Sequence, residues 1–187
     1  MRHMEIAAVI LAAGASSRFG SPKQVARIGG RTMLGAVAAT AHDAGLRPVI
    51  AVVPPGLAVP ADVVPVLNDA PTAGLSRSLR LGLAAVPPEC DGAVILLGDQ
   101  PTLSPDTIRA VLAAAGAERP LVAASEGGRA APPVLLRRDA FELADDAVGD
   151  EGLRAILTGR PEIVTRVEVG TLPPDVDTPA DLAALER

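Results

Sequence analysis

Residues 5–23 carry the sequence EIAAVILAAGASSRFGSPK, an apolar run that changes abruptly into small residues and then into basic ones. Residues 6–11 are short, apolar on both faces and rich in β-branched side chains, which is typical of a buried parallel strand covered by helices on both sides. Residues 12–17 carry almost no side-chain volume, so a ligand can lie against the backbone N–H groups of this loop. The sequence therefore predicts a buried strand that ends in a binding loop.

Two cations follow this loop, Arg18 and Lys23, and both side chains can neutralise phosphate charge. Gly14 supplies the conformational freedom that such a turn requires. The loop has neither the G-x-G-x-x-G spacing of dinucleotide-binding proteins nor the G-K-[ST] ending of a P-loop. Taken alone, a loop of this kind favours an ordinary turn that carries two solvated cations.

A second candidate site begins after the strand expected at residues 63–67, where Asn68 leads through Gly74 into a helix starting near residue 75. The start of this helix is dense in hydroxyls and cations, and a helix N-terminus of that kind can receive an anion or the edge of a base. Ser78 is a candidate ligand contact. The alternative is that Ser76 or Ser78 only caps the helix.

Carboxylates mark a third candidate site. Asp99 directly follows an apolar strand at residues 93–97, and open α/β sheets bind their ligands at the carboxyl ends of such strands. We interpret Asp99 as a metal ligand, the alternative being a turn cap. Asp175 and Asp177 are spaced by two on an extended segment, so they either bind one cation together or serve as caps. Thr178 and Asp181 form a capping-box pattern.

The remaining periodicity predicts one Rossmann-like α/β domain over residues 1–187, a three-layer sandwich with a mainly parallel sheet of about seven strands. Residues 1–4 are a candidate disordered extension. Further strands are expected at residues 48–53, 121–125, 134–136 and 162–169, the last as an edge or antiparallel strand, and further helices at 32–45, 104–116, 137–146, 153–158 and from 178 onward.

Composition argues against several classes of protein. The net charge is −5 and the only aromatic residues are Phe19 and Phe141, so neither a basic field nor a stacking platform for nucleic acid is present. No apolar run approaches the roughly 20 residues that a membrane span needs, and we expect a cytoplasmic protein without a membrane partner. Cys90 is the single cysteine and is interpreted as an incidental loop thiol, and two scattered histidines predict no catalytic triad.

Several of these segments together carry a resemblance. Leu11-Ala12-Ala13-Gly14, followed by Ser16, Arg18, Gly20 and Lys23, resembles the L-A-A-G-x-S-x-R-x-G-x-x-K signature of the nucleotidyltransferases that activate sugars, isoprenoid precursors and molybdenum cofactor. Residues 98–101 resemble the G-D-Q-P of molybdopterin cytidylyltransferases, and residues 78–83 resemble the cytosine-reading helix of that family. Residues 149–154 resemble its G-D-x-G-x-R segment near the acceptor, although Asp150 is equally compatible with a helix cap, and residues 175–182 resemble its D-I-D-T-P-E-D-L ending.

The resemblance implies transfer of CMP from CTP to a phosphate-bearing acceptor, with release of pyrophosphate. The implied catalytic residues are Lys23, Arg18 and Asp99, and Asp99 and Asp177 are the implied Mg²⁺ ligands. The implied nucleotide-binding residues are Leu11, Ala12, Ala13, Gly14, Ser16, Arg18, Lys23, Asn68, Gly74 and Ser78.

The implied acceptor is molybdenum cofactor, with a molybdoenzyme as recipient of the product. Alternatives are GTP as donor, another acceptor such as a sugar phosphate or methylerythritol phosphate, and a non-catalytic accessory protein that binds molybdenum cofactor. Ala13, Ser78 and Gln100 match the cytidylyl branch of the family. The guanylyl relatives usually carry L-A-G-G around the position of Ala13 and G-D-M-P around that of Gln100. Ala131 and Pro132 stand where the family usually has a Gly before the Pro, a departure that bears on acceptor identity.

Overall fold

The computed structural model describes residues 4–14, 19–20, 22–116 and 118–185. Its centre is a seven-stranded sheet in the order β5-β4-β1-β6-β8-β7-β9. All strands of this sheet run in one direction except β8, which pairs antiparallel with both β6 and β7. The strands are β1 (Ile6–Leu11), β4 (Val49–Val53), β5 (Val64–Leu67), β6 (Gly92–Leu97), β7 (Leu121–Glu126), β8 (Arg129–Arg137) and β9 (Val164–Glu168). The α/β fold with a mostly parallel seven-stranded sheet is confirmed.

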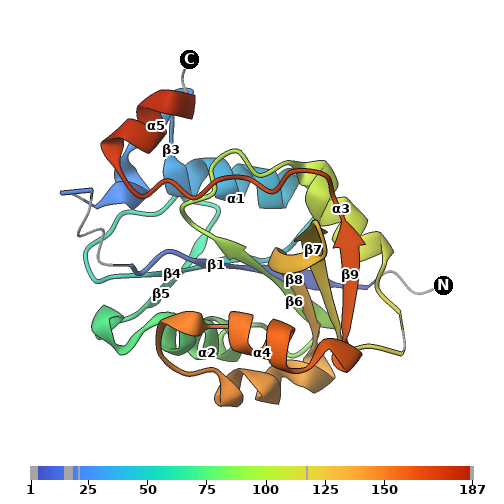
Figure 1. Ribbon diagram of the computed structural model, residues 1–187. Coiled ribbons are helices and arrows are strands. Elements are labelled where there is room, and N and C mark those ends of the chain that lie inside the picture. Colours follow the sequence, from blue (N-terminus) through green and yellow to red (C-terminus); the bar gives the residue numbers. More distant parts are fainter. Residues whose placement is uncertain (1–3, 15–18, 21, 117, 186–187) are drawn as a thin grey trace.

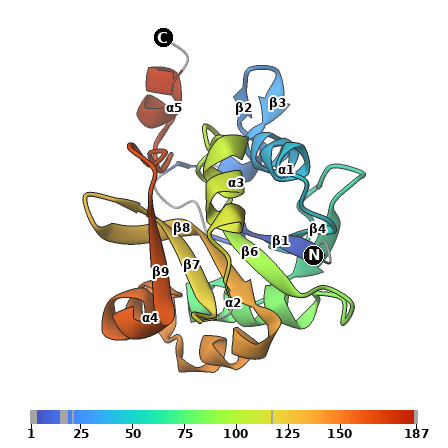
Figure 2. The same ribbon diagram turned by 90° about the vertical axis from the view of Figure 1, so that its right-hand side faces the viewer.

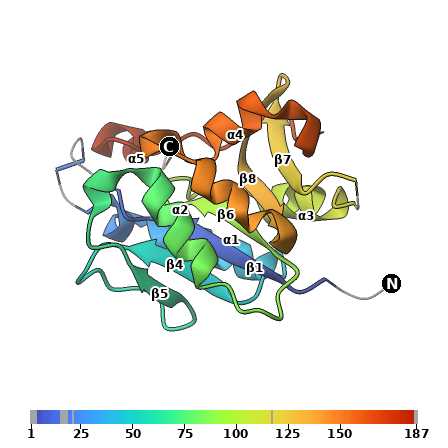
Figure 3. The same cartoon turned by 90° about the horizontal axis from the view of Figure 1, so that it is seen from below.

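Helices cover both faces of the sheet and complete a three-layer arrangement (Figure 1). One layer contains α1 (Met33–Asp43), α3 (Pro105–Ala113) and α5 (Pro179–Leu185). The opposite layer, seen from below in Figure 3, contains α2 (Leu75–Ala84), α4 (Arg154–Gly159) and the 3₁₀ segment η3 (Arg138–Asp146). Short 3₁₀ turns are η1 (Lys23–Val25), η2 (Pro71–Ala73), η4 (Gly149–Glu151) and η5 (Pro161–Ile163). None of the described helices is long and apolar enough to cross a membrane.

The first strand shows why the core has two halves. Alternate residues of β1 point to opposite faces: Ala7, Val9 and Leu11 join the core under α2, η3 and α4, and Ile6, Ala8 and Ile10 join the core under α1 and α3. All six are buried. The continuous apolar run is therefore the signature of a strand covered on both sides, as the sequence predicts.

Helix α2 approaches the sheet closely at Gly82. A Cβ atom at this position would lie 2.3 Å from Cγ1 of Val9 and 3.1 Å from Cγ2 of Val52. Only glycine leaves room for the helix backbone to pack against two strands at this distance. This contact fixes the position of the helix whose N-terminus faces the carboxyl end of β1.

Capping signals identify helix starts correctly. The Thr32 hydroxyl accepts a hydrogen bond from Gly35 N at 3.0 Å at the start of α1, and the Ser104 hydroxyl accepts from Asp106 N at 3.1 Å at the start of α3. Both residues satisfy N–H groups that have no partner within the helix. These caps confirm the predictions for both helices.

Three elements differ from the expectations. The segment expected as an amphipathic helix at residues 137–146 is 3₁₀, because its ends are held by contacts from elsewhere: Arg138 donates to the carbonyl oxygen of Cys90, and Arg80 donates to that of Ala147. For strand β9 the edge alternative is confirmed and the antiparallel one is wrong, since it lies at the end of the strand order and pairs parallel with β7. A short hairpin of β2 (Arg27–Ile28) and β3 (Arg31–Thr32) was not predicted.

The carboxyl ends of β1, β4 and β6 lie at one edge of the sheet, the left edge in Figure 1. The extended chain after β9 returns along the α1–α3 layer to this edge, where α5 begins. Figure 2 looks from the opposite edge and shows α5 and the β2–β3 hairpin on the α1–α3 side of the sheet. The three candidate segments of the sequence therefore meet at one edge.

Candidate functional site

Lys23 joins two of the predicted carboxylates. Its ammonium nitrogen lies 2.9 Å from Oδ2 of Asp99 and 3.0 Å from Oδ1 of Asp177, and it donates to the carbonyl oxygen of Val176 at 3.1 Å. The side chains are 13%, 25% and 32% exposed for Lys23, Asp99 and Asp177, so the ion pairs are only partly solvated. Residues more than 150 positions apart thus form one charged centre at the carboxyl end of β6.

The backbone holds this centre in place. Val176 is fully buried, and its N–H donates to the carbonyl oxygen of Asp99 at 2.8 Å. The N–H of Thr178 donates to Oδ2 of Asp181 at 2.8 Å, and the N–H of Asp181 donates to the Thr178 hydroxyl at 3.2 Å. This is the predicted capping box, and it fixes the direction in which the chain leaves Asp177.

The two carboxylates fit a divalent cation. Oδ1 of Asp99 is buried and has no hydrogen-bond partner among the described residues, so a second acceptor oxygen remains at the centre. No group of three or more potential metal ligands occurs within the described ranges. Mg²⁺ commonly uses one or two carboxylates and completes its shell with water and substrate phosphates. Asp99 and Asp177 would hold such an ion.

Charge and burial shift two pKa values at the centre. Burial alone would lower the pKa of Lys23, but hydrogen bonds and charge interactions with Asp99 and Asp177 outweigh it and raise the pKa above 10.5. Lys23 is therefore an ammonium at neutral pH. Partial burial and the neighbouring Asp99 charge raise the pKa of Asp175, and the hydrogen bond from Gln100 partly offsets this shift. The Asp175 carboxyl is thus harder to ionise than an ordinary aspartate side chain.

Gln24 is a site residue that the sequence analysis missed. Its side chain is only 3% exposed, and its amide nitrogen donates to the carbonyl oxygens of Ala12 at 2.8 Å and Gly14 at 3.0 Å. Gln24 thereby fixes the backbone of the loop that follows β1. The available signal is its position next to Lys23, but nothing local indicates that an amide side chain will be buried there.

The start of α2 forms a second polar group. Asn68 is fully buried, donates from Nδ2 to the Ser78 hydroxyl at 3.0 Å, and accepts at Oδ1 from Nε of Arg77 at 3.0 Å. No side-chain cap hydrogen bond forms at the N-terminus of α2, so the capping alternative for Ser76 and Ser78 is wrong. At Gly74, which has φ of +90°, a Cβ would lie 2.4 Å from the carbonyl carbon of Gly149, so the start of α2 touches η4 directly.

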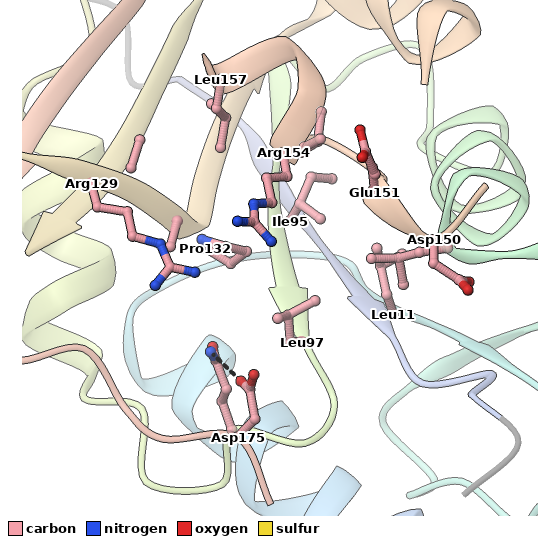
Figure 4. Close-up of a pocket in the computed structure, with 15 residues that line it drawn as sticks. Leu11, Ile95, Leu97, Arg129, Pro132, Asp150, Glu151, Arg154, Leu157 and Asp175 are labelled. Atoms are coloured by element: carbon pink, nitrogen blue, oxygen red, sulfur yellow. Dashed lines mark hydrogen bonds between the residues drawn. The ribbon is translucent and has the colours of Figure 1, made fainter. Parts of the chain in front are cut away.

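A cavity of about 290 Å³ opens between the ends of β1 and β6 and the helix α4 (Figure 4). Apolar side chains, two arginines and several acidic residues line it: Leu11, Leu75, Ile95, Leu97, Gln100, Arg129, Ala130, Ala131, Pro132, Asp150, Glu151, Leu153, Arg154, Leu157 and Asp175. Asp150 makes no capping hydrogen bond to α4, so that alternative is wrong as well. Gln100 donates from Nε2 to Oδ1 of Asp175 at 2.9 Å, at the side of the cavity next to the charged centre.

A family model described as a MobA-like NTP transferase domain matches residues 8–165, from β1 into β9. The chain belongs to this family. The resemblance seen in the sequence is thereby confirmed at the level of nucleotidyltransferases, which share the α/β fold described above.

Similar proteins agree with this assignment of the MobA-like domain. Rv0371c from Mycobacterium tuberculosis H37Rv is 30% identical with a TM-score of 0.84, and the match covers 97% of each chain. Its complex with manganese is 29% identical with a TM-score of 0.79, covering 99% of each chain. The 2-C-methyl-D-erythritol 4-phosphate cytidylyltransferase from Thermus thermophilus shares the fold at 22% identity and a TM-score of 0.68, covering 95% of this chain and 96% of that one.

The curated relative named bifunctional protein GlmU, from Clavibacter sepedonicus, is 37% identical over 131 residues. The match covers 60% of this chain and 25% of that protein. The MobA-like domain therefore spans about a quarter of the length of this relative.

The structure brings some of the predicted site residues together and separates others. Lys23, Asp99 and Asp177 form one centre, and Asn68 and Ser78 form another. Ala12, Ala13 and Gly14 form the loop fixed by Gln24, Leu11 contributes to the floor of the cavity, and Gly74 lies against η4. Ser16 and Arg18 lie outside the described residues, as do residues 1–3 of the expected extension.

Proposed function

We propose that this MobA-like domain transfers CMP from CTP to a phosphate group of an acceptor. An oxygen of the acceptor phosphate attacks the α-phosphorus of CTP and forms a new P–O–P bond. The bond between the α- and β-phosphates breaks, and pyrophosphate leaves with the electron pair. The observation that carries this proposal is the convergence of Lys23, Asp99 and Asp177 at the strand ends, beside the loop that Gln24 fixes.

The loop after β1 is suited to seating the nucleotide. Across a trans peptide, the C=O and N–H groups point in opposite directions. Because the carbonyl oxygen of Ala12 points to Gln24, the N–H of Ala13 points away from it. Backbone N–H groups oriented in this way can hold phosphate oxygens or polar edges of a nucleotide. Gln24 therefore prepares the loop for a ligand before the ligand arrives.

Lys23, together with Arg18, is proposed to neutralise the triphosphate, and Asp99 and Asp177 are proposed to hold Mg²⁺. When bound, the ion would neutralise phosphate charge and polarise the reacting phosphoryl group. In the structure the Lys23 ammonium lies between the same two carboxylates. Lys23 must therefore release at least one of them before they can hold a divalent ion, and its flexible stem lets the freed ammonium turn toward phosphate.

Preference for CTP over GTP rests on three residues. Ala13 adds a methyl group to the loop, and Ser78 offers a short hydroxyl close to Asn68 at the start of α2. Gln100 is 6% exposed and lines the cavity. Discrimination between bases depends on hydrogen bonds that the wrong base leaves unmade. We propose that the domain turns over CTP at least ~10-fold better than GTP by kcat/KM, or about 1.4 kcal/mol.

The proposed acceptor is molybdenum cofactor, with a molybdoenzyme receiving the product, because the G-D-Q-P segment, the helix at residues 78–83 and the ending at residues 175–182 resemble the enzymes that use it. One observation supports a second candidate acceptor. Ala131 and Pro132 line the cavity at the point where the family usually carries glycine. The same chemistry on a sugar phosphate or on methylerythritol phosphate is therefore the second candidate, and similarity in fold to the T. thermophilus cytidylyltransferase is compatible with it.

Pyrophosphate release with each of the four NTPs, with and without molybdenum cofactor, tests the proposal. We expect release only with Mg²⁺, CTP and an acceptor together, and its loss in Asp99→Asn, which keeps side-chain size but removes the charge. Asp106→Asn is the matched control, because Asp106 is an exposed residue of α3 that pairs with Arg109. No release with any acceptor, combined with tight binding of molybdenum cofactor, would favour a non-catalytic accessory protein. Equal turnover of GTP would refute the CTP assignment and leave nucleotidyl transfer standing.

A further inference from the structure

The segment that follows β9 carries one of the two carboxylates of the charged centre. This return segment, residues 169–178, connects β9 to α5 (Figure 2) and is part of no helix or strand. Asp177 lies near its far end, 3.0 Å from the Lys23 ammonium. Because no regular ladder of backbone hydrogen bonds holds the return segment, its position depends on individual contacts with neighbouring elements.

The first of these contacts is made by Glu168, the last residue of β9. Its carboxylate accepts three hydrogen bonds from the hairpin that joins β7 to β8: from the Ser125 hydroxyl at 2.9 Å, from the N–H of Gly127 at 2.7 Å and from the N–H of Gly128 at 3.4 Å. The hydrogen bonds from Gly127 and Ser125 hold the pKa of Glu168 below its usual value, so the side chain is a carboxylate at neutral pH. The end of β9 is thereby joined to the hairpin.

A second glutamate makes the reciprocal contact from the hairpin. Glu126 ends β7, and its Oε2 accepts a hydrogen bond from the N–H of Leu172 at 3.3 Å. The two contacts lie on either side of Gly170, which has φ of +78° and is the point of greatest backbone freedom in the return segment. Glu168 holds the chain before this glycine and Glu126 holds it after. We call these two residues the glutamate clamp.

The chain between the clamp and the charged centre is stiff. Residues 173–174 are both proline, which fixes φ at two successive positions and restricts the backbone of Leu172 as well. Val176 then donates from its N–H to the carbonyl oxygen of Asp99 at 2.8 Å. Few backbone torsions remain to absorb a displacement, so a shift at Leu172 is carried to Val176 and Asp177.

We propose that Glu126 and Glu168 are positioning residues for the metal site: by fastening the return segment to the β7–β8 hairpin, they set the place from which Asp177 holds a divalent cation. Their hydrogen bonds go to the hairpin and to Leu172, so their effect on the cation passes through the return segment. This inference rests on the proposed function, since it explains how the same metal site acquires its second carboxylate.

Hydrogen exchange measured by NMR tests the clamp at a single amide. The Val176 N–H is buried and bonded to Asp99, so its protection reports whether the return segment is in place. Glu126→Met and Glu168→Met keep the side-chain length and remove both acceptor oxygens. In the double variant we expect the Val176 amide to lose ~10-fold or more of its protection, and the amides of β1 to lose less than ~2-fold, because only the return segment is loosened.

Two further variants show whether the acceptor oxygens matter. Glu168→Gln keeps one acceptor oxygen and places an NH₂ donor among the donors of the hairpin, so its Val176 protection should lie between those of Glu168→Met and the unmodified protein. Glu162→Met is the matched control, because Glu162 is an exposed acidic residue of η5 that precedes β9. We expect this control to leave the protection of Val176 unchanged.

Mn²⁺ binding, followed by EPR in the presence of a non-hydrolysable CTP analogue, tests the consequence for the cation. We expect the double variant to bind Mn²⁺ at least ~10-fold more weakly than the unmodified protein does. Binding of the analogue without metal should be unchanged, because the loop after β1 is held by Gln24 and not by the clamp.

The inference is overturned if Val176 in the double variant loses no more protection than the amides of β1, or if the affinity for Mn²⁺ does not change. An equally large effect of Glu162→Met would also overturn it, since the response would then be to loss of surface charge. The proposed function fails separately if the unmodified protein binds neither the analogue nor Mn²⁺. In that case the exchange of Val176 alone decides whether the clamp holds the return segment.

Discussion

Lys23 is the only lysine among the 187 residues, and replacing it should have opposite effects on stability and on metal binding. Lys23→Met keeps most of the apolar stem and removes the charge. The Lys23 ammonium lies 2.9 Å from Asp99 and 3.0 Å from Asp177, so at an effective dielectric constant of about 20 each pair is worth about 5 to 6 kcal/mol of Coulomb attraction. Without the ammonium, two carboxylates face each other uncompensated.

Desolvation offsets most of that attraction. Removing one partner of a buried pair costs about 3–5 kcal/mol, and side chains that are 13–32% exposed call for a discount, so we expect a loss of about 2 kcal/mol. For a chain of this size, that loss lowers Tm by about 4–8 °C. Because the folded-state pKa of Lys23 is raised, the stabilisation is fully present at neutral pH and is lost only as pH rises through that pKa, above 10.5.

Metal binding should change in the other direction. In the unmodified protein, a divalent ion must displace the ammonium from Asp99 or Asp177, whereas in Lys23→Met both carboxylates are available. The same concentration of Mg²⁺ or Mn²⁺, without nucleotide, should therefore raise the Tm of the variant more than that of the unmodified protein. Turnover should nevertheless fall by ~10²-fold or more, and by more than nucleotide affinity, because the cation matters most as charge develops on the leaving pyrophosphate.

Thermal unfolding with and without Mg²⁺ measures the first two effects, with Arg166→Met as the control for loss of an exposed cation. Reductive ¹³C-methylation adds a direct observation, since a chain with one lysine gives one side-chain amine signal beside that of the N-terminus. This signal should move when Mg²⁺ and a CTP analogue are added together. The reasoning is refuted if Lys23→Met is as stable as the unmodified protein and gains no more from Mg²⁺. Equal losses of affinity and turnover would show that Lys23 is only a uniform anchor.

Three further changes follow from single contacts. Gln24→Met removes the two hydrogen bonds to the carbonyl oxygens of Ala12 and Gly14, each worth roughly 0.5–1.5 kcal/mol, and should raise KM for CTP in steady-state assays more than it lowers kcat; an unchanged KM would argue against the loop assignment. Gly82→Ala places a methyl group 2.3 Å from Val9 and should cost about 1–3 kcal/mol in chemical denaturation, whereas Gly159→Ala, with open space around it, should not. Asp175→Asn should raise Tm at pH 7, because the raised pKa of Asp175 means that its ionised form destabilises the folded state; the difference should shrink as pH falls through that pKa, and a lower Tm at pH 7 would contradict this account.

Local patterns were sufficient to predict most of the fold. The apolar run at residues 6–11 has no polar alternation, which identifies a strand covered on both faces, and it is the central β1. Thr32 and Ser104 mark the starts of α1 and α3 because capping depends only on neighbouring residues. Strand positions and helix starts are encoded within a few residues, so the sequence reveals them.

Features that depend on long-range contacts could not be predicted from local patterns. The direction of β9 depends on its pairing with β7, not on its own residues, so its parallel orientation was open until the sheet was assembled. The ends of η3 are held by two distant contacts: Arg138 at its start donates to the carbonyl oxygen of Cys90, and Arg80 donates to that of Ala147 directly after its end. Gln24 is similar, since its burial requires the turn of η1 to bring it under the loop. Each of these features is decided by a partner distant in sequence.

The charged centre includes residues that lie beyond the matched family domain. The matched family domain ends at residue 165, yet Val176 and Asp177 complete the centre. Val176 links it in both directions, since its N–H donates to Asp99 and its carbonyl oxygen accepts from Lys23. The three motifs found separately in the sequence are therefore mutually dependent in the structure, because moving any one backbone segment breaks a bond to each of the others. A change in the segment after β9 should accordingly reach Lys23 and Asp99 even though it lies beyond the matched domain.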